Sequence, residues 1–204
     1  MGLLEREFLL IDCQTTGMRP SSGHLLEIAW SVVRADSSEP LKKKSFLVRL
    51  PEGAGIPRRV TEITGLTDAD LAEAVEPAEI LRLLQQDLGR LDWALIHYAQ
   101  FEKPFLTQLF GLAPDEPLPF EVLCTHQLAK KLLPRLPSQN IRGLAGHFGA
   151  KFHEFKRAAS HVQATHEIWR GLAPMLAQKE IETPQQIRKW MSAQPKTKAE
   201  PYEY

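Results

Sequence analysis

Asp12 is the residue whose setting points most directly to chemistry. It ends the run Phe8–Asp12, which is otherwise apolar and has the length of a short strand. A Thr-Thr-Gly turn at residues 15–17 follows, and such a turn places backbone N–H groups and hydroxyls beside the carboxylate. A second carboxylate at position 14 would favour a metal site, but Gln14 has an amide there. The stretch therefore indicates a site that is one acid short.

The segments that follow Asp12 predict the strands that position it. Phe8–Asp12 is continuously apolar, which is typical of a strand buried on both faces. Leu25–Arg34 and Ser45–Leu50 are rich in β-forming residues and are predicted as the second and third strands. Turns separate the three, so we expect an antiparallel meander.

The rest of the chain alternates helical and strand patterns. Two further short strands are predicted at Trp93–Ile96 and Phe120–Cys124. Helices are predicted at Arg58–Ile63, shortly after Thr67, at Pro77–Leu88, through Pro104 to Phe110, at Thr125–Leu133, from Ser138 to Gly149, at Arg157–Leu176, and from Thr183 through Trp190. This order predicts an α/β fold with a mixed five-stranded sheet and helices on both faces.

Composition is that of an ordinary globular protein. Of 204 residues, 43% are hydrophobic, and 25 basic side chains balance 25 acidic ones for a formal net charge of zero. That balance argues against non-specific clamping of duplex nucleic acid, although a local groove remains compatible with it. Cys13 and Cys124 lie in apolar or strand-like settings, so we expect reduced core thiols rather than a disulfide or metal pair.

One domain with a short appendage is the expected organisation. Residues 1–180 are predicted to form the α/β domain, residues 181–194 an appended helix, and residues 195–204 a polar, disordered tail. The N-terminal sequence does not have the pattern of a signal peptide, and no run reaches the ~18 apolar residues of a membrane span. We therefore expect a cytoplasmic protein without a membrane partner.

Several short motifs occur in a recognisable order. Residues 12–17 lie on the pattern Asp-x-Glu-Thr-Thr-Gly, residues 97–102 on His-Asn-x-x-Phe-Asp, and residues 156–165 on His-Arg-Ala-x-x-Asp-Ala-x-Ala-Thr. Similar matches occur at residues 26–29, 61–67, 124–134 and 138–149. From about residue 7 to 178 the chain resembles the DEDDh 3′–5′ exonucleases of the RNase H-like fold. The resemblance is to the branch that contains the epsilon proofreading subunit of DNA polymerase III and RNase T.

The resemblance implies a catalytic site in which most positions are substituted. In the family, four carboxylates hold two divalent ions, Mg²⁺ or Mn²⁺, and a histidine acts as general base toward water. The equivalent positions here are Asp12, Gln14, Glu102, Lys156 and His161. Asp12 and Glu102 contribute a charge of −2 and Lys156 adds +1, where the family has −4. We therefore predict a degenerate site in which Asp12 and Glu102 hold at most one ion.

Each substitution leaves an alternative open. The Gln14 carbonyl can ligate a metal weakly or make an ordinary hydrogen bond, and Glu102 can reach a metal or a bridging water or be a surface acid. Lys156 fits a solvated residue at a helix start, and His153 is a candidate base if the alignment slips there. His161 suits zinc or manganese better than magnesium, and it fits a structural histidine as well.

A nucleotide pocket is also implied by the resemblance. Aromatic side chains hold single strands by stacking on bases, without reading their sequence. For Phe101 and Phe105, packing in the core is an equal alternative. The residues expected to line the pocket are Thr15, Thr16, Gly17, His97, Tyr98, Phe101 and Phe105.

Three functions follow from these expectations. The first is a substituted exonuclease-fold protein that binds single-stranded 3′ ends of DNA or RNA, or a protein partner, with little or no hydrolysis. The second is an active 3′–5′ exonuclease with an altered metal site built from Asp12, Glu102 and His161. The third is a pure protein-interaction module. The C-terminal helix is a candidate docking element, and the resemblance to RNase T leaves a homodimer open.

Overall fold

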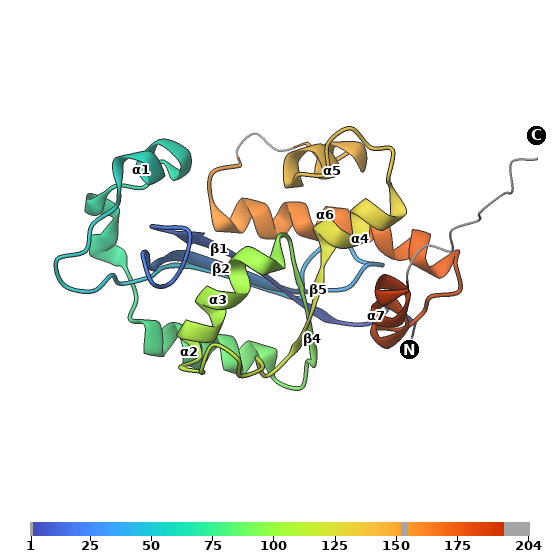
Figure 1. Cartoon of the computed structure of the whole chain (residues 1–204), viewed down its shortest axis with the longest axis horizontal. Coiled ribbons are helices and arrows are strands. Elements are labelled where there is room, and N and C mark those ends of the chain that lie inside the picture. Colours follow the sequence, from blue (N-terminus) through green and yellow to red (C-terminus); the bar gives the residue numbers. More distant parts are fainter. Residues whose placement is uncertain (1, 152–154, 194–204) are drawn as a thin grey trace, which may run out of the picture.

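A five-stranded mixed sheet is the frame of the protein. The computed structural model describes residues 2–151 and 155–193, so His153 and the tail predicted at 195–204 lie outside the described residues. The strand order is β3-β2-β1-β4-β5, as the ribbon shows (Figure 1). The strands are β1 (Phe8–Thr15), β2 (Leu25–Val33), β3 (Lys42–Leu47), β4 (Trp93–Ile96) and β5 (Glu121–Cys124).

Strand directions confirm the predicted meander. β1 pairs antiparallel with β2, and β2 pairs antiparallel with β3. β4 runs parallel to β1, and β5 runs parallel to β4. β1 is thus the central strand, and its Asp12 lies opposite Ala29 of β2 in the ladder.

Helices cover both faces of this sheet. In Figure 1, α2 and α3 lie on one side of the strands, while α4, α5 and α6 lie on the other. The helices are α1 (Arg58–Thr64), the 3₁₀ helix η1 (Asp68–Glu73), α2 (Pro77–Leu88), α3 (Ala99–Leu109), α4 (Thr125–Leu132), α5 (Ile141–His147), α6 (Ala158–Ala177) and α7 (Pro184–Ser192).

Alternate side chains of β1 contribute to two hydrophobic cores, one on each face of the sheet. Successive side chains of a strand point to opposite faces. Phe8 therefore packs toward α6, where its ring meets Trp169 edge-on at 4.9 Å between centroids. Leu9 and Ile11 pack on the other face with Ile80 of α2. The prediction that this strand is buried on both faces is confirmed.

β3 lies earlier than predicted, at Lys42–Leu47 rather than at residues 45–50. The lysines of β3 interrupt the apolar pattern that would indicate a strand. Lys42 and Lys44 reach the buried carboxylate of Asp87 on α2, at 3.3 and 2.9 Å. Trp30 donates its indole N–H to the same carboxylate at 3.0 Å. A charged edge strand of this kind also resists pairing with other chains.

α5 begins later than predicted, because Asn140 rather than Ser138 is its cap. The Asn140 side chain accepts a hydrogen bond from the N–H of Gly143 at 2.8 Å. Ser138 lies within about 3 Å of the position that a Cβ on Gly143 would take, so the cap loop folds back tightly on the helix. The predicted helix is otherwise present.

The C-terminal helix α7 docks on the α6 side of the domain. Ile187 is fully buried in the core that contains α6. Lys131 of α4 donates to the carbonyls of Trp190, Met191 and Ala193 at the end of α7. In the described part of the chain, no helix is both long and apolar enough to cross a membrane.

Replacing Gly171 with alanine tests the packing of α5 against α6. A Cβ at Gly171 would lie 2.2 Å from the Phe148 ring, so Gly171→Ala should lower the free energy of unfolding by about 1–3 kcal/mol. Gly146→Ala is the matched control, because a Cβ there meets nothing within 4 Å and should be neutral or stabilising by up to ~1 kcal/mol. Urea denaturation measures both, and equal effects would contradict this packing.

Candidate functional site

Asp12 and His161 form the centre of the site. Asp12 is buried on β1, and His161 lies in the first turns of α6. The His161 Nδ1 atom is 3.2 Å from each carboxylate oxygen of Asp12. The histidine thus occupies the space in front of the carboxylate, at the position where the family motif has an acid.

His161 has an acceptor at each of its ring nitrogens. Its Nε2 lies 3.1 Å from the carbonyl oxygen of Phe155, while Nδ1 faces Asp12. Both nitrogens satisfy these acceptors only when both carry a proton, which makes the ring a cation. Burial lowers the pKa of His161, but the Asp12 carboxylate and the Phe155 carbonyl outweigh it and raise this pKa overall. The geometry is that of an imidazolium–carboxylate pair.

Gln14 completes the arrangement around this pair. Its amide nitrogen lies 3.3 Å from Nδ1 of His161, where two N–H donors do not bond if the ring is doubly protonated, and its side chain hydrogen-bonds Asp12. Burial raises the pKa of Asp12, and the bonds from His161 and Gln14 oppose that rise. Gln14 therefore acts on the Asp12 carboxylate as a hydrogen-bond donor.

Glu102 lies beside this pair as a buried acid. It is in the first turn of α3, with 3% of its surface exposed. Burial and the nearby charge of Asp12 raise the pKa of Glu102 well above its usual range. Its Oε2 atom has no hydrogen-bond partner among the described residues. Both effects favour the protonated form of the Glu102 side chain.

Glu27 is a structural acid that sequence reasoning missed. It lies opposite Gln14 in the β1–β2 ladder and is 1% exposed. Arg157 donates to its carboxylate through Nε and Nη2, with a shortest distance of 2.8 Å, and the N–H of Ala158 donates at 3.0 Å. These bonds fix the start of α6, which carries His161. A charged residue in the middle of an apolar strand was the available signal.

Lys156 is the predicted site residue that the structure does not bring to Asp12. Its side chain is exposed, and its Cδ lies near Gly65, which ends α1. Within the described chain, Lys156 forms an ion pair with neither Asp12 nor Glu102. The other three family-equivalent residues, Gln14, Glu102 and His161, gather around Asp12.

The Thr-Thr-Gly turn uses its hydroxyls locally. Thr15 donates to the carbonyl of Gly17 at 2.7 Å, and Thr16 accepts from the N–H of His24 at 2.8 Å. The backbone at Gly17 passes so close to Ser22 that a Cβ would lie 2.6 Å from its carbonyl oxygen. The turn is therefore held rigid beside the site.

The predicted aromatic residues divide between surface and core. Tyr98 is 44% exposed and stacks on His126 with 4.1 Å between ring centroids. Its φ of 62° is in the left-handed region, which is uncommon for a tyrosine. His97 is buried and bonds Thr125 at 2.9 Å, and Phe105 is buried in the core.

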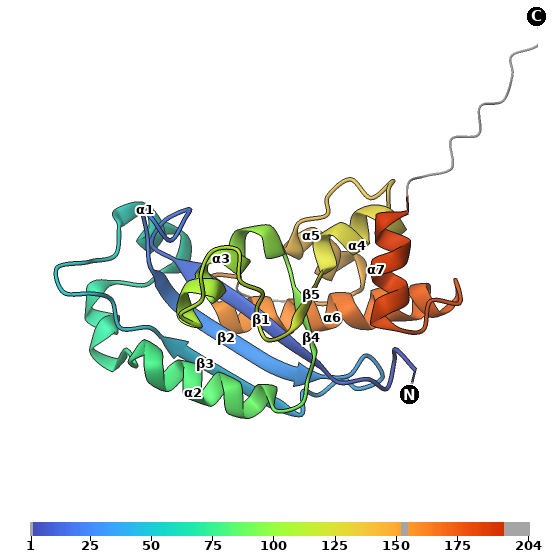
Figure 2. The ribbon, with the colours of Figure 1, turned by 60° about the horizontal axis from the view of Figure 1, so that its bottom comes forward.

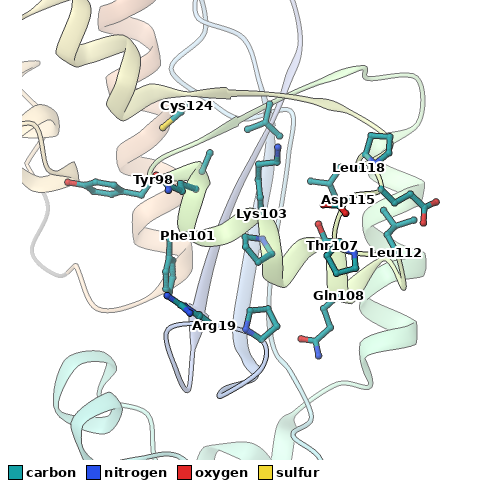
Figure 3. A pocket seen from close by; sticks show the side chains of 18 of the residues that line it. Arg19, Tyr98, Phe101, Lys103, Thr107, Gln108, Leu112, Asp115, Leu118 and Cys124 are labelled. Carbon is teal, nitrogen blue, oxygen red and sulfur yellow. The ribbon is translucent and has the colours of Figure 1, made fainter.

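An open groove of about 1650 Å³ begins at Tyr98 and Phe101 and runs along α3. Its far wall is the segment that contains Asp115 and Leu118, as Figure 3 shows. Asp12, His161 and the residues that surround them do not line it. The groove is therefore a neighbour of the Asp12 site rather than part of it.

Comparison with known proteins identifies the class. The family described as exonuclease, of the RNase T type, matches residues 9–168. The chain therefore belongs to this exonuclease family, as the motifs predicted.

Relatives and solved structures agree with this assignment. The chain is 28% identical over 180 residues to the PolC-type DNA polymerase III of Oceanobacillus iheyensis, spanning 88% of this chain but 12% of that polymerase. It is 26% identical to the epsilon subunit of DNA polymerase III of Aquifex aeolicus, spanning 82% of this chain and 81% of the subunit.

Among solved structures, exonuclease X in complex with 5′-overhanging duplex DNA matches with a TM-score of 0.67 and 20% identity, over 90% of this chain and 99% of that one. The nuclease domain of 3′hExo, a DEDDh family member bound to rAMP, matches with a TM-score of 0.68 and 13% identity, over 90% and 98%. The predicted RNase H-like fold is confirmed.

The residues present do not fit the metal centre of the family. Members of the family normally use divalent metal ions. Here both oxygens of Asp12 face His161, and burial together with the charge of Asp12 raises the pKa of Glu102, which disfavours its anionic form. Among the described residues, no group of three or more His, Cys, Asp or Glu side chains is arranged to hold a metal ion. A cation site needs anionic oxygens directed at one point.

Glu102 should give stability a measurable pH dependence. Its pKa is raised in the folded protein, so between about pH 4.5 and that pKa the folded chain holds one proton more than the unfolded chain. Wild-type stability should therefore fall across this window relative to Glu102→Gln, by up to ~1.4 kcal/mol per pH unit. Urea denaturation from pH 4.5 to 8 in EDTA measures the difference, and parallel curves would contradict the raised pKa of Glu102.

Proposed function

We propose that this protein binds single-stranded 3′ ends of DNA or RNA and hydrolyses them little or not at all. The observation that carries the proposal is the pairing of Asp12 with His161 at 3.2 Å. In two-metal hydrolysis, one ion generates hydroxide and the other stabilises the leaving oxygen. A cationic ring in front of the central carboxylate opposes the binding of both ions.

The charge of the site supports the same conclusion. The Asp12 carboxylate faces His161, the Glu27 carboxylate is matched by Arg157, and the raised pKa of Glu102 disfavours its anionic form. Each of these effects weakens the attraction of the site for dications. A phosphate, in contrast, meets less repulsion here than at a cluster of four carboxylates.

A general base is also missing from the expected position. Lys156 stands where the family motif has a histidine, and its exposed side chain lies near Gly65. A lysine ammonium has three N–H donors and no lone pair with which to accept a proton from water. Position 156 therefore supplies no base for the activation of water, and the alternative base, His153, lies outside the described residues.

Two features of the structure support the binding of single-stranded nucleic acid. The rigid turn at residues 15–17 and the exposed ring of Tyr98 flank the region next to Asp12. Aromatic rings hold the bases of single strands by stacking, at ~1–3 kcal/mol per base. Several solved structures of the same fold contain nucleic acid, including Escherichia coli exonuclease I with a dT13 oligonucleotide.

One observation favours a second function, an exonuclease with an altered metal site. The Oε2 atom of Glu102 is buried next to Asp12 and has no partner in the described structure. A manganese ion that displaced the proton of Glu102 and the ring of His161 would gain two carboxylate ligands. This alternative requires that both side chains rearrange.

A nuclease assay separates the two functions. Wild-type protein with millimolar Mg²⁺ or Mn²⁺ should bind labelled single-stranded DNA or RNA, measured by fluorescence anisotropy, and trim it little or not at all. The reconstructed variant Gln14→Glu/Glu102→Asp/Lys156→His/His161→Asp should trim faster by about 10³-fold, which corresponds to ~4 kcal/mol of transition-state stabilisation.

Asp12→Ala is the control for contaminating nucleases. Robust trimming by the wild type that disappears in Asp12→Ala would show an active enzyme and overturn the proposal. Absence of salt-dependent oligonucleotide binding in EDTA would remove the binding part and favour a protein-interaction module.

A further inference from the structure

Four charged side chains, two of each sign, line the open groove along α3. The cations are Arg19 and Lys103, and the anions are Asp115 and Glu116. All four side chains are exposed, and none of them forms an ion pair within the described part of the chain. The groove therefore presents unpaired charge to a ligand, and the position of each sign decides which ligand fits.

The two signs lie at opposite ends of the groove. Lys103 is near the start of α3, and Arg19 is in the turn between β1 and β2, which lies beside α3 (Figure 2). Asp115 and Glu116 belong to the loop that follows α3, and Figure 3 shows Arg19 and Asp115 far apart along the helix. The dipole of α3 has the same polarity, positive where the helix begins and negative where it ends. The groove is therefore positive at one end and negative at the other.

The positive end of the groove adjoins the site at Asp12. Arg19 closely follows the rigid turn at residues 15–17, which lies beside Asp12. Lys103 is the neighbour of the buried Glu102 in α3. A nucleic-acid strand whose 3′ end lies at Asp12 can therefore reach both cations next along its backbone.

Two aromatic rings form the wall of the groove at this same end. Tyr98 is exposed and Phe101 is half-buried, and both line the groove. Each ring packs on a second ring, Tyr98 on His126 at 4.1 Å and Phe101 on Phe105 at 5.7 Å between centroids. Rings that are supported in this way stack on the bases of a single strand, and neighbouring cations attract its phosphates. The positive end therefore has the features of a single-strand site.

The negative end of the groove repels the same ligand. Asp115 and Glu116 would face the phosphates of a strand that continued along α3, and like charges repel. The Glu116 carboxylate accepts a hydrogen bond from the N–H of Ala113 at 3.2 Å, which fixes its position. Pro114 and Pro117 flank the two acids and restrict the backbone of the loop. A strand bound at the positive end must therefore leave the groove before this loop.

We propose that the positive end of the groove binds the nucleotides that precede a single-stranded 3′ end, with their phosphates at Arg19 and Lys103 and their bases on the two aromatic rings. The negative end then turns the strand out of the groove. The protein therefore binds a short single-stranded end and gains little affinity from a longer one. This assignment rests on the function proposed above and adds to it a path and a limit on length.

Removing the two cations tests the path. Binding of a labelled oligothymidylate is measured by fluorescence anisotropy in EDTA at several salt concentrations. Each phosphate contact contributes ~0.7 to the salt slope of a single strand, so Arg19→Ala/Lys103→Ala should lower the slope by about 1.4 and the affinity at ~0.1 M salt by about tenfold or more. The control Arg90→Ala/Lys179→Ala also removes one exposed arginine and one exposed lysine, but neither lines the groove, so the slope should not change.

Neutralising the negative end tests the limit on length. Asp115→Asn/Glu116→Gln keeps the size of both side chains, and the new amide retains an oxygen for the N–H of Ala113. Affinity is measured for oligothymidylates of about 3 to 16 nucleotides. The affinity of the wild type should stop rising after the first few nucleotides. In the variant it should continue to rise, so that the longest strands bind severalfold more tightly than to the wild type while the shortest bind equally.

Two results would overturn this proposal and leave the proposed function intact. A wild-type salt slope in Arg19→Ala/Lys103→Ala would mean that the strand leaves Asp12 by another route. The same dependence on length in the wild type and in Asp115→Asn/Glu116→Gln would mean that the negative end does not limit the strand. Absence of oligonucleotide binding by the wild type, in contrast, would overturn both proposals together.

Discussion

The pairing of Asp12 with His161 is the interaction on which the rest of the site depends. It places a cation on α6 against a carboxylate on the central strand, at 3.2 Å. In an exonuclease with intact carboxylates, metal ions would link the same two elements. Here the side chains complete the link without them. Removing either partner would leave the other buried and unpaired, which costs several kcal/mol. The substitution at position 161 is therefore a structural feature as well as a change in chemistry.

Contacts of the neighbouring elements fix the position of the Asp12–His161 pair. Glu27 holds Arg157 and the N–H of Ala158, so the first turn of α6 is tied to β2. β2 in turn is in register with β1 through Gln14. The carbonyl of Phe155 then accepts from the far side of the His161 ring. These contacts hold the Asp12–His161 pair in place inside an intact exonuclease fold.

Much of the fold could be predicted because its signals are local. The continuous apolar run of β1 and the bounds of α2 and β4 follow from patterning alone, and the motifs fixed the family. The start of β3 was predicted too late, because Lys42 and Lys44 form ion pairs with Asp87 on α2, which is 43 or more residues away in the chain. Glu27 was missed for the same reason, because its partner, Arg157, is 130 residues away in the chain. The gathering of Gln14, Glu102 and His161 around Asp12 was expected from the resemblance, whereas the exposed place of Lys156 near Gly65 required the structure.

The most direct test of the account is whether Asp12 is available to a metal ion. Electron paramagnetic resonance of Mn²⁺ measures the free ion in the presence of protein. Wild-type protein at sub-millimolar concentration should leave the free Mn²⁺ signal unchanged, whereas the variant Gln14→Glu/His161→Asp should reduce the signal by binding the ion. A wild-type chain that bound one Mn²⁺ and lost it in Asp12→Ala would contradict the claim that His161 has taken the place of the metal.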